Sequence, residues 1–159
     1  MIVMSSQKKK KGNSGSIDNK RARFDYEIKD TFMAGLVLSG PEVRSIRAAH
    51  TSLLGSFIQM KDGEAWLMNS TVTPLKTNAA QLPSELQIRN RKLLLKKREL
   101  ESLQEAKNQG LTIVPLRILN KGRFIKIEIA TAKGKRQYDK RQTIKQRDTD
   151  RDQRRELSR

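Results

Sequence analysis

The sequence predicts a mainly β protein with accessory helices, built as a small closed barrel of the oligonucleotide-binding (OB) type with disordered basic arms. Short segments that alternate apolar and polar residues recur between residues 24 and 132, separated by turn residues. Only one stretch has the period of a longer helix. Because a closed barrel accommodates many short strands in a small domain, we favour it over a sandwich.

Positive charge is concentrated at the two ends of the chain. The net charge of +17 comes from 34 Lys/Arg against 17 Asp/Glu among 159 residues. Residues 1–23 hold 7 basic and 1 acidic residue, and residues 133–159 hold 11 basic and 5 acidic residues. Two basic arms around a nearly balanced middle are typical of nucleic-acid-binding proteins. We therefore expect a disordered arm at 1–18, a nucleic-acid-binding barrel at 19–132 and a basic tail at 133–159.

The arms have too few apolar residues to fold alone. Residues 5–23 lack apolar periodicity and should be mobile. In the tail, only Tyr138, Ile144 and Leu157 are sizeable apolar residues. Since Gly134 is its last glycine and it contains no proline, the tail can form a helix once a partner supplies contacts.

The first half of the domain contains strand and turn patterns. Phe24, Tyr26 and Ile28 alternate with polar residues, which predicts a strand. A second strand is expected over 32–38, where Gly35 suggests a bulge or a close backbone approach. Pro41 suits the first turn of a helix that we expect to end near Ala48.

A hairpin and a helix are predicted next. Residues 56–61 and 64–69 read as strands joined by Asp62-Gly63, a strong hairpin signal. Residues 71–75 fit one more short strand, and residues 76–87 are weakly patterned loop. Helical spacing of apolar residues runs over 90–108, and Gly110 is a suitable C-cap.

The domain closes with a second predicted hairpin, formed by residues 111–119 and 124–131. Ile125, Ile127 and Ile129 should point to the core. Pro115 in the first of these strands requires an edge or a bulge.

No catalytic, metal or cofactor site is predicted. The chain has no cysteine and one histidine, His50, which we interpret as a surface or capping residue. The tight carboxylate pairs, Glu27 with Asp30 and Asp62 with Glu64, lie next to predicted strand ends and turns, where solvated acids are common. We keep an RNA-processing enzyme that uses Asp62 and Glu64 as a minor alternative.

The charge could also serve an anionic membrane, but we favour RNA or DNA. No segment has the roughly 20 apolar residues of a membrane-spanning helix, and the basic tail lacks an apolar face. The short apolar run Met1-Ile2-Val3-Met4 comes before the lysines, which is the reverse of the order in a signal peptide. We expect a cytoplasmic location.

Several motifs together resemble the small protein B family of bacterial tmRNA-binding proteins. They are colinear over about residues 19–147 and comprise Asn19-Lys20-Arg21-Ala22-Arg23 with Tyr26, Ala34-Gly35, Gly40 with Glu42-Val43-Arg44-Ser45-Ile46-Arg47-Ala48, Lys61-Asp62-Gly63-Glu64, Arg91-Lys92-Leu93-Leu94-Leu95, Ala132-Lys133-Gly134-Lys135, and Asp139-Lys140-Arg141 with Ile144-Lys145 and Arg147.

The resemblance implies a non-enzymatic protein, without cofactor, that acts in ribosome rescue. Such a protein binds the tRNA-like domain of tmRNA and delivers it to ribosomes stalled without a stop codon. Elongation factor Tu is an indirect partner through the aminoacylated tmRNA. The tail would occupy the empty mRNA channel by the decoding centre, contact rRNA there and become helical. We expect a monomer when the protein is free, and no membrane partner.

The resemblance also assigns residues to each partner. The RNA-binding residues would be Lys20, Arg21, Arg23, Tyr26, Gly35, Glu42, Ser45, Arg47, Leu94 and Lys126. The ribosome-binding tail residues would be Gly134, Lys135, Tyr138, Asp139, Lys140, Arg141, Ile144 and Lys145.

The chain departs from the family pattern at three places. Met33 replaces an acidic residue that the family uses at its RNA-binding surface. Residues 83–89, within the atypical loop 76–90, replace the usual approach to Arg91. Asn120 stands where an aromatic residue is common. On composition alone, a ribosomal or general RNA-chaperone protein with basic tails fits equally well.

Overall fold

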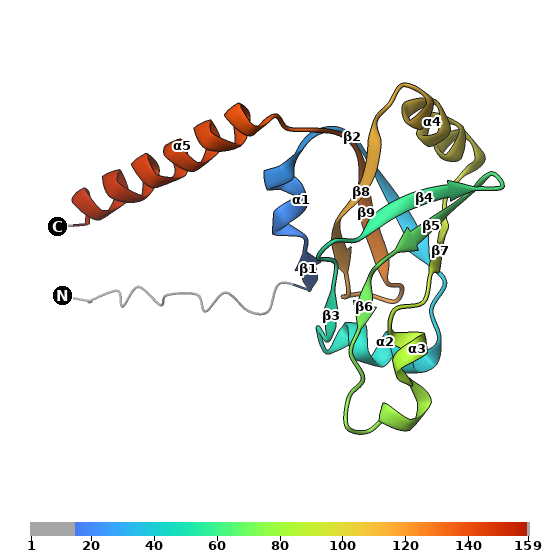
Figure 1. The fold of residues 1–159 in the computed structure, drawn as a ribbon. Coiled ribbons are helices and arrows are strands. Elements are labelled where there is room, and N and C mark those ends of the chain that lie inside the picture. Colours follow the sequence, from blue (N-terminus) through green and yellow to red (C-terminus); the bar gives the residue numbers. More distant parts are fainter. Residues whose placement is uncertain (1–14, 159) are drawn as a thin grey trace, which may run out of the picture.

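The structure, a computed structural model, describes residues 15–158. Its main feature is a seven-stranded antiparallel sheet (Figure 1). In spatial order the strands are β1 (Ser16–Asp18), β8 (Thr112–Leu119), β9 (Lys126–Gly134), β2 (Tyr26–Leu36), β7 (Arg91–Leu94), β5 (Glu64–Met68) and β4 (Phe57–Lys61). A second sheet pairs β3 (Thr51–Ser52) with β6 (Thr71–Val72).

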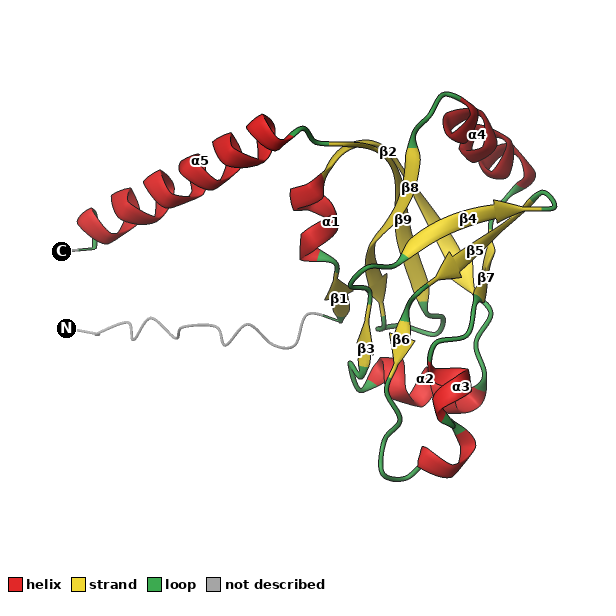
Figure 2. Ribbon diagram, viewed as in Figure 1, coloured by secondary structure: helices red, strands yellow, loops and turns green. Residues whose placement is uncertain are grey.

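Residues 15–158 contain five α-helices and one 3-10 turn, and all of these except the last helix lie close to the sheets (Figure 2). They are α1 (Lys20–Asp25), α2 (Gly40–Arg47), η1 (Ala79–Gln81), α3 (Ser84–Gln87), α4 (Lys97–Asn108) and α5 (Gln137–Glu156). The last helix projects away from the rest of the molecule, whereas α2 and α3 lie together at its opposite end (Figure 1). The prediction of a mainly β protein with accessory helices is confirmed.

The closed barrel is not shown by the strand pairing. Strands β1 and β4 form the two ends of the large sheet, and no described sheet closes on itself. Strand β4 nevertheless contacts β8, so the sheet curls toward itself. The largest cluster of buried residues, which includes Leu67, Leu103 and Ile127, fills the concave side.

The longest pairing joins β2 with β9 at the centre of the sheet. Ile125, Ile127 and Ile129 are buried, as predicted, whereas Lys126 between them is exposed. Ala130 and Ala132 also lie inside, because they pack against Ala22 of α1 in a second buried cluster. This part of β9 is therefore covered on both faces.

Several local predictions are confirmed. Asp62 and Gly63 both have positive φ, at 52° and 74°, which fits the tight turn between β4 and β5. Pro41 stands at the start of α2, and the strand register shifts between Pro115 and Arg117, as a bulge requires. Gly110 has a φ of 83° directly after α4.

The helix predicted over 90–108 is wrong in its first third. Residues Arg91–Leu94 form β7, which pairs with β2 and β5, and α4 begins only at Lys97. A run of three leucines is compatible with the apolar spacing of a helix and with that of a buried strand. Pairing with two neighbouring strands therefore decides the conformation. Loop 76–87 also contains more structure than predicted, namely η1 and α3.

Two further differences concern the start of the domain. Phe24 belongs to α1 rather than to a strand, and the two strands predicted over 24–38 are one strand, β2, with an irregularity between Ile28 and Thr31. We expected residues 16–18 to be mobile. They form β1 instead, because their backbone pairs with the edge of β8 opposite β9. Residues 1–14 of the predicted arm, with its lysine run, lie outside the described residues.

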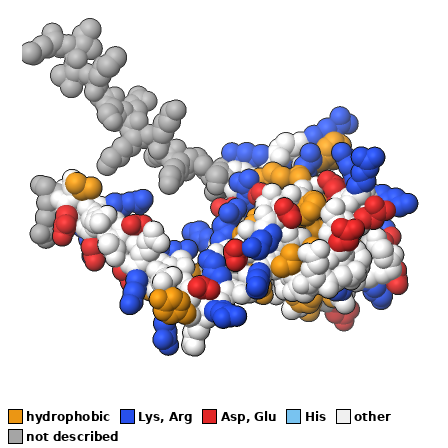
Figure 3. Space-filling view, turned by 90° about the horizontal axis from the view of Figure 1, so that it is seen from above, with side chains coloured by type: hydrophobic (Ala, Val, Ile, Leu, Met, Phe, Trp, Pro, Cys, Tyr) orange, Lys and Arg blue, Asp and Glu red, His pale blue; other side chains and the backbone are white. Residues whose placement is uncertain are grey.

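The tail is helical over Gln137–Glu156, and none of its side chains is buried. Figure 3 shows it as a separate arm that carries both basic and acidic side chains. That this helix depends on a partner remains a prediction.

Candidate RNA-binding surface

Helix α1 presents basic residues on the outside of the sheet. Asn19 caps it by accepting the Ala22 N–H at 3.3 Å, and the Asn19 side-chain amide donates to the carbonyls of Leu53 and Pro115. This anchor fixes the orientation of the helix, which leaves its basic side chains exposed: Lys20, Arg21 and Arg23. Tyr26 follows directly and packs, half-buried, against the cluster under α1.

A second group of predicted residues meets at an open cleft of about 700 Å³. Gly35 on β2 lies opposite Leu94 on β7 and opposite Lys126 on β9, so strand pairing brings the three together. A Cβ on Gly35 would come within 3.3 Å of the Leu94 Cβ, so the glycine makes room for a neighbouring side chain rather than for another backbone segment. Leu94 is 55% exposed, and Lys126 is exposed beside it.

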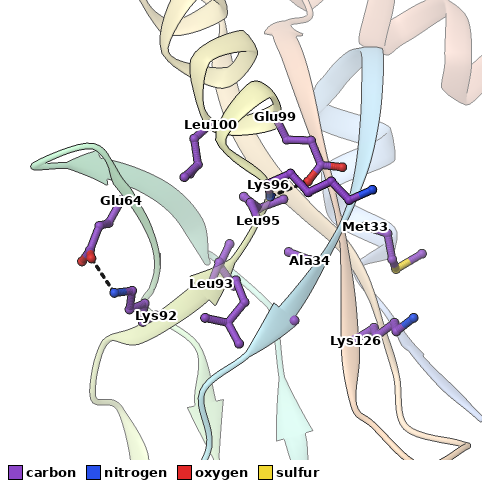
Figure 4. A pocket seen from close by; sticks show the side chains of 12 residues that line it. Met33, Ala34, Glu64, Lys92, Leu93, Leu95, Lys96, Glu99, Leu100 and Lys126 are labelled. Atoms are coloured by element: carbon purple, nitrogen blue, oxygen red, sulfur yellow. Dashed lines mark hydrogen bonds and ion pairs between the residues drawn. The ribbon is translucent and has the colours of Figure 1, made fainter.

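Met33 lies two residues from Gly35 and lines the same cleft. Figure 4 shows its side chain on the same side as Lys126. It is 41% exposed, so a thioether, rather than the acid usual in the family, is presented here. At the other side of the cleft, Glu64 forms an ion pair with Lys92 (Figure 4).

Glu42 and Ser45, which we expected to face RNA, are instead fully buried on the inner face of α2. The Glu42 carboxylate accepts hydrogen bonds from Arg89 Nε at 2.8 Å and from Arg91 Nε at 2.9 Å. It also accepts the Ser39 N–H at 2.8 Å, which caps α2. Ser45 Oγ accepts from the Asn78 side chain at 3.2 Å. These two residues shape the surface from inside.

The ion pair determines the protonation of Glu42. Burial raises the pKa of its carboxyl, but the hydrogen bonds from Arg89 and the Ser39 N–H, together with the positive charges of Arg91 and Arg89, outweigh burial and hold that pKa below its ordinary value of 4.5. Burial lowers the pKa of Arg91, and Glu42 partly offsets this. Glu42 is therefore ionised at neutral pH.

Arg91 is the residue that the sequence reasoning missed most clearly. Its guanidinium is 1% exposed, and besides Glu42 it donates to the carbonyls of Ser70, Leu86 and Gln87. It thereby fastens β7 to α2, to the residue before β6 and to the end of α3. The motif Arg91-Lys92 reads as a basic cluster in sequence, and no local signal marks one of its members as buried.

Arg47 is exposed and also holds a neighbouring loop in place. At the end of α2, its guanidinium donates to the carbonyls of Asn120, Gly122 and Arg123, at 3.0 to 3.2 Å. These bonds shape the β8–β9 loop, which presents Phe124 with 68% of its surface exposed. Asn120 holds the same loop by donating to the carbonyl of Ile46.

The predicted tail residues begin where β9 ends. Gly134 pairs with Tyr26, and the Lys135 N–H donates to the carbonyl of Asp25. Lys140 forms an ion pair with Asp25 at 2.9 Å. The remaining predicted residues lie along the exposed surface of α5: Tyr138, Asp139, Arg141, Ile144 and Lys145.

Apart from Arg47 and the residues along α5, the structure gathers the predicted residues into three places. Gly35, Leu94 and Lys126 line the cleft, the basic residues of α1 adjoin the base of the tail, and Glu42 with Ser45 lies inside. Among residues 15–158 no three acidic or histidine side chains cluster as metal ligands would. No helix in that range has the length and apolar character needed to cross a bilayer.

Comparison with known proteins identifies the family. Residues 16–159 match the family model for SmpB protein. An SsrA-binding protein of Pseudomonas syringae pv. syringae is 50% identical over 147 residues, covering 91% of both chains, and one from Streptococcus mutans is 48% identical over 140 residues, covering 87% of this chain and 89% of its own.

A solved structure described as "tmRNA-SmpB: a journey to the center of the bacterial ribosome" is similar at a TM-score of 0.63 and 38% identity, covering 82% of this chain and 94% of that one. The chain belongs to the SmpB family.

Proposed function

We propose that this protein acts in trans-translation, by binding the tRNA-like domain of tmRNA and delivering it to ribosomes stalled on mRNA that lacks a stop codon. The observation that carries the proposal is the identity of about half of all residues to SsrA-binding proteins over nearly the whole chain. Elongation factor Tu would join through the aminoacylated tmRNA. The role is that of a binding protein rather than an enzyme, and its place is the cytoplasm.

Two surfaces of the body would bind the tmRNA. The basic side chains of α1 contribute charge for phosphates, and the cleft beside Gly35 offers Leu94 for apolar contact with Lys126 next to it. Arg47 would act through the loop that it shapes, and the buried Glu42 and Ser45 through the position of α2. The contact between β4 and β8 supports a barrel of the oligonucleotide-binding type as the framework.

The tail would enter the mRNA channel of the ribosome. Helix α5 has 20 residues and a length of about 30 Å at 1.5 Å per residue. Charge divides the tail in two, since residues 133–147 carry a net +6 and residues 148–159 are balanced. The first half therefore supplies the affinity for rRNA, and Gly134 would serve as the hinge between body and tail.

Salt dependence of RNA binding tests the first part of the proposal. We expect tight binding to the tRNA-like domain of tmRNA; 6 to 10 phosphate contacts would lower the affinity by about 10³ to 10⁵ between 50 and 200 mM salt. Filter binding or fluorescence anisotropy against tmRNA and random RNA of equal length measures this. Equal affinity for both RNAs at physiological salt would contradict the proposal.

Deleting residues 134–159 tests the division of work between body and tail. The truncated protein should bind tmRNA normally but fail to support tagging of stalled chains in a reconstituted translation system. Tagging at the full rate would show that the tail has no such role. Sedimentation with every ribosome, stalled or not, would instead favour a general ribosomal protein.

Met33 defines a further test of the cleft. Replacing it by Glu restores the acid common in the family, with little effect on folding because the side chain is exposed. If the cleft binds RNA, Met33→Glu changes tmRNA affinity while Glu85→Gln, on exposed α3, does not. An unchanged affinity would place the RNA away from this part of the cleft.

A further inference from the structure

One carboxylate lies between the basic helix α1 and the base of the tail. Asp25 Oδ1 accepts from Lys140 Nζ of α5 at 2.9 Å, and Asp25 Oδ2 accepts from Arg21 Nε of α1 at 3.2 Å. The backbone carbonyl of Asp25 also accepts the Lys135 N–H at 2.9 Å. Asp25 therefore contacts the tail through its main chain and its side chain.

A second contact continues the same face of α5. The guanidinium carbon of Arg147 lies 5.5 Å from the centre of the Phe24 ring, within the range of a cation–π interaction. Arg147 follows Lys140 by seven residues, two helical turns, so both side chains point to α1. Lys135 Nζ adds a hydrogen bond to the carbonyl of Arg23 at 3.3 Å.

Electrostatics explains why a carboxylate is needed at this junction. Helix α1 carries Lys20, Arg21 and Arg23, and Asp25 is its only acidic residue. The half of the tail next to it has a net charge of +6. Two basic segments repel each other unless an acid lies between them. A hydrogen bond from Lys140, and next the one from Arg21, lowers the pKa of Asp25, so the carboxylate is charged at neutral pH.

We propose that Asp25 is a positioning residue that fixes the direction in which α5 leaves the sheet, by pairing with α1 and with the tail at the same time. Its two partners are Arg21, a candidate tmRNA contact, and Lys140, a candidate ribosome contact. The pairing holds the start of α5 against α1, while the rest of the helix projects as a separate arm (Figure 3). A tail held there lies beside α1 and contributes no residue to the lining of the cleft.

A distance measurement between spin labels tests this directly. The chain has no native cysteine, so labels at Glu101→Cys on α4 and Gln153→Cys on α5 report only the intended pair. Asp25→Asn should broaden the distance distribution and lower the population at the original distance about five-fold, as expected for partly exposed ion pairs. Asp25→Glu should retain much of that population. Asp30→Asn, which removes an exposed acid from the same region, should leave it unchanged.

Two further variants protect the test from a folding defect. Lys140→Ala leaves α1 intact and should broaden the distribution as Asp25→Asn does. The exchange Asp25→Lys with Lys140→Asp should recover part of the original population, which no general loss of structure would do. A distribution in Asp25→Asn identical to that of the native protein, or no recovery in the exchange, would overturn the proposal.

The consequence for tagging rests on the proposed function, whereas the distance measurement does not. Asp25→Asn should keep tmRNA affinity within about two-fold, because Arg21 remains, and should slow tagging of stalled ribosomes. An unchanged tagging rate together with a broadened distribution would overturn the claim that the fixed direction matters for delivery. Failure of the native protein to bind tmRNA would count against the proposed function alone.

Discussion

Charged residues serve opposite purposes in the body of the protein and in its tail. Under α2, Glu42 is 0% exposed, and two arginines surround it so that it joins parts of the chain far apart in sequence. In α5 no side chain is buried, and most of its charges lie along an exposed helix that contacts α1 through Lys140 and Arg147. The body uses its buried charge to fix a shape, whereas the tail keeps its charge available for a partner.

The largest expected difference comes from removing the buried carboxylate. Glu42→Gln leaves Arg91 without its counter-charge in a site that is 1% exposed, so we expect a loss of about 3–5 kcal/mol in the free energy of unfolding. Urea unfolding followed by the fluorescence of Trp66, the single tryptophan, measures it. Glu85→Gln on exposed α3 is the control, and a loss below about 1 kcal/mol in Glu42→Gln would contradict this account.

Acid should weaken the same site, with a sign that follows from the pKa of Glu42. Because the folded state lowers that pKa, the stabilisation is complete above the ordinary value of 4.5 and is lost as pH falls through the lower folded value. Unfolding free energies measured from pH 6 to pH 3 should decline in the native protein. They should decline less in Glu42→Gln; equal slopes would assign the decline to other carboxyls.

A smaller loss of stability is expected at the start of α1. Asn19→Ala removes the cap of this helix and leaves the buried carbonyls of Leu53 and Pro115 without this donor. We expect a loss of about 1–2 kcal/mol. Asn90→Ala, at an exposed position before β7, provides the comparison in the same urea experiment. A change in Asn19→Ala no larger than in Asn90→Ala would mean that water replaces these bonds.

The smallest effect on the body should come from breaking the tail helix. Proline inside a helix costs about 3 kcal/mol locally, yet α5 packs no buried residue on the sheet. Gln146→Pro should therefore reduce the helical signal at 222 nm and leave the free energy of unfolding of the body within about 0.5 kcal/mol of the native value. Gln146→Ala controls for loss of the side chain. A shifted midpoint would show that body and tail unfold together.

The sequence allowed the parts of the fold with local causes to be predicted. The turn at Asp62-Gly63, the helix start at Pro41 and the inward isoleucines of β9 depend on residues close in the chain. Strand β7 does not, since its leucines fit a helix equally well and only pairing with β2 and β5 selects a strand. The order of the strands likewise depends on contacts that no spacing reveals.

The sequence predicts which residues belong to the candidate site better than it predicts which of them are exposed. Family resemblance assigned Glu42 to the RNA surface because motifs record which residue stands where, not which way it points. Its partner Arg89 lies 47 residues further along the chain, so burial follows from a long-range contact. Gly35, Leu94 and Lys126 were named separately, and the pairing of three strands explains why they form one cleft.

The place where the tail joins the body determines how the molecule transmits force. Helix α5 follows β9, which lies between β8 and β2 in the interior of the sheet rather than at an edge. A pull on the tail toward its C-terminus therefore acts along β9, across many backbone hydrogen bonds at once, instead of opening them one after another. The tail is thus attached to a strand that has backbone partners on both sides along most of its length.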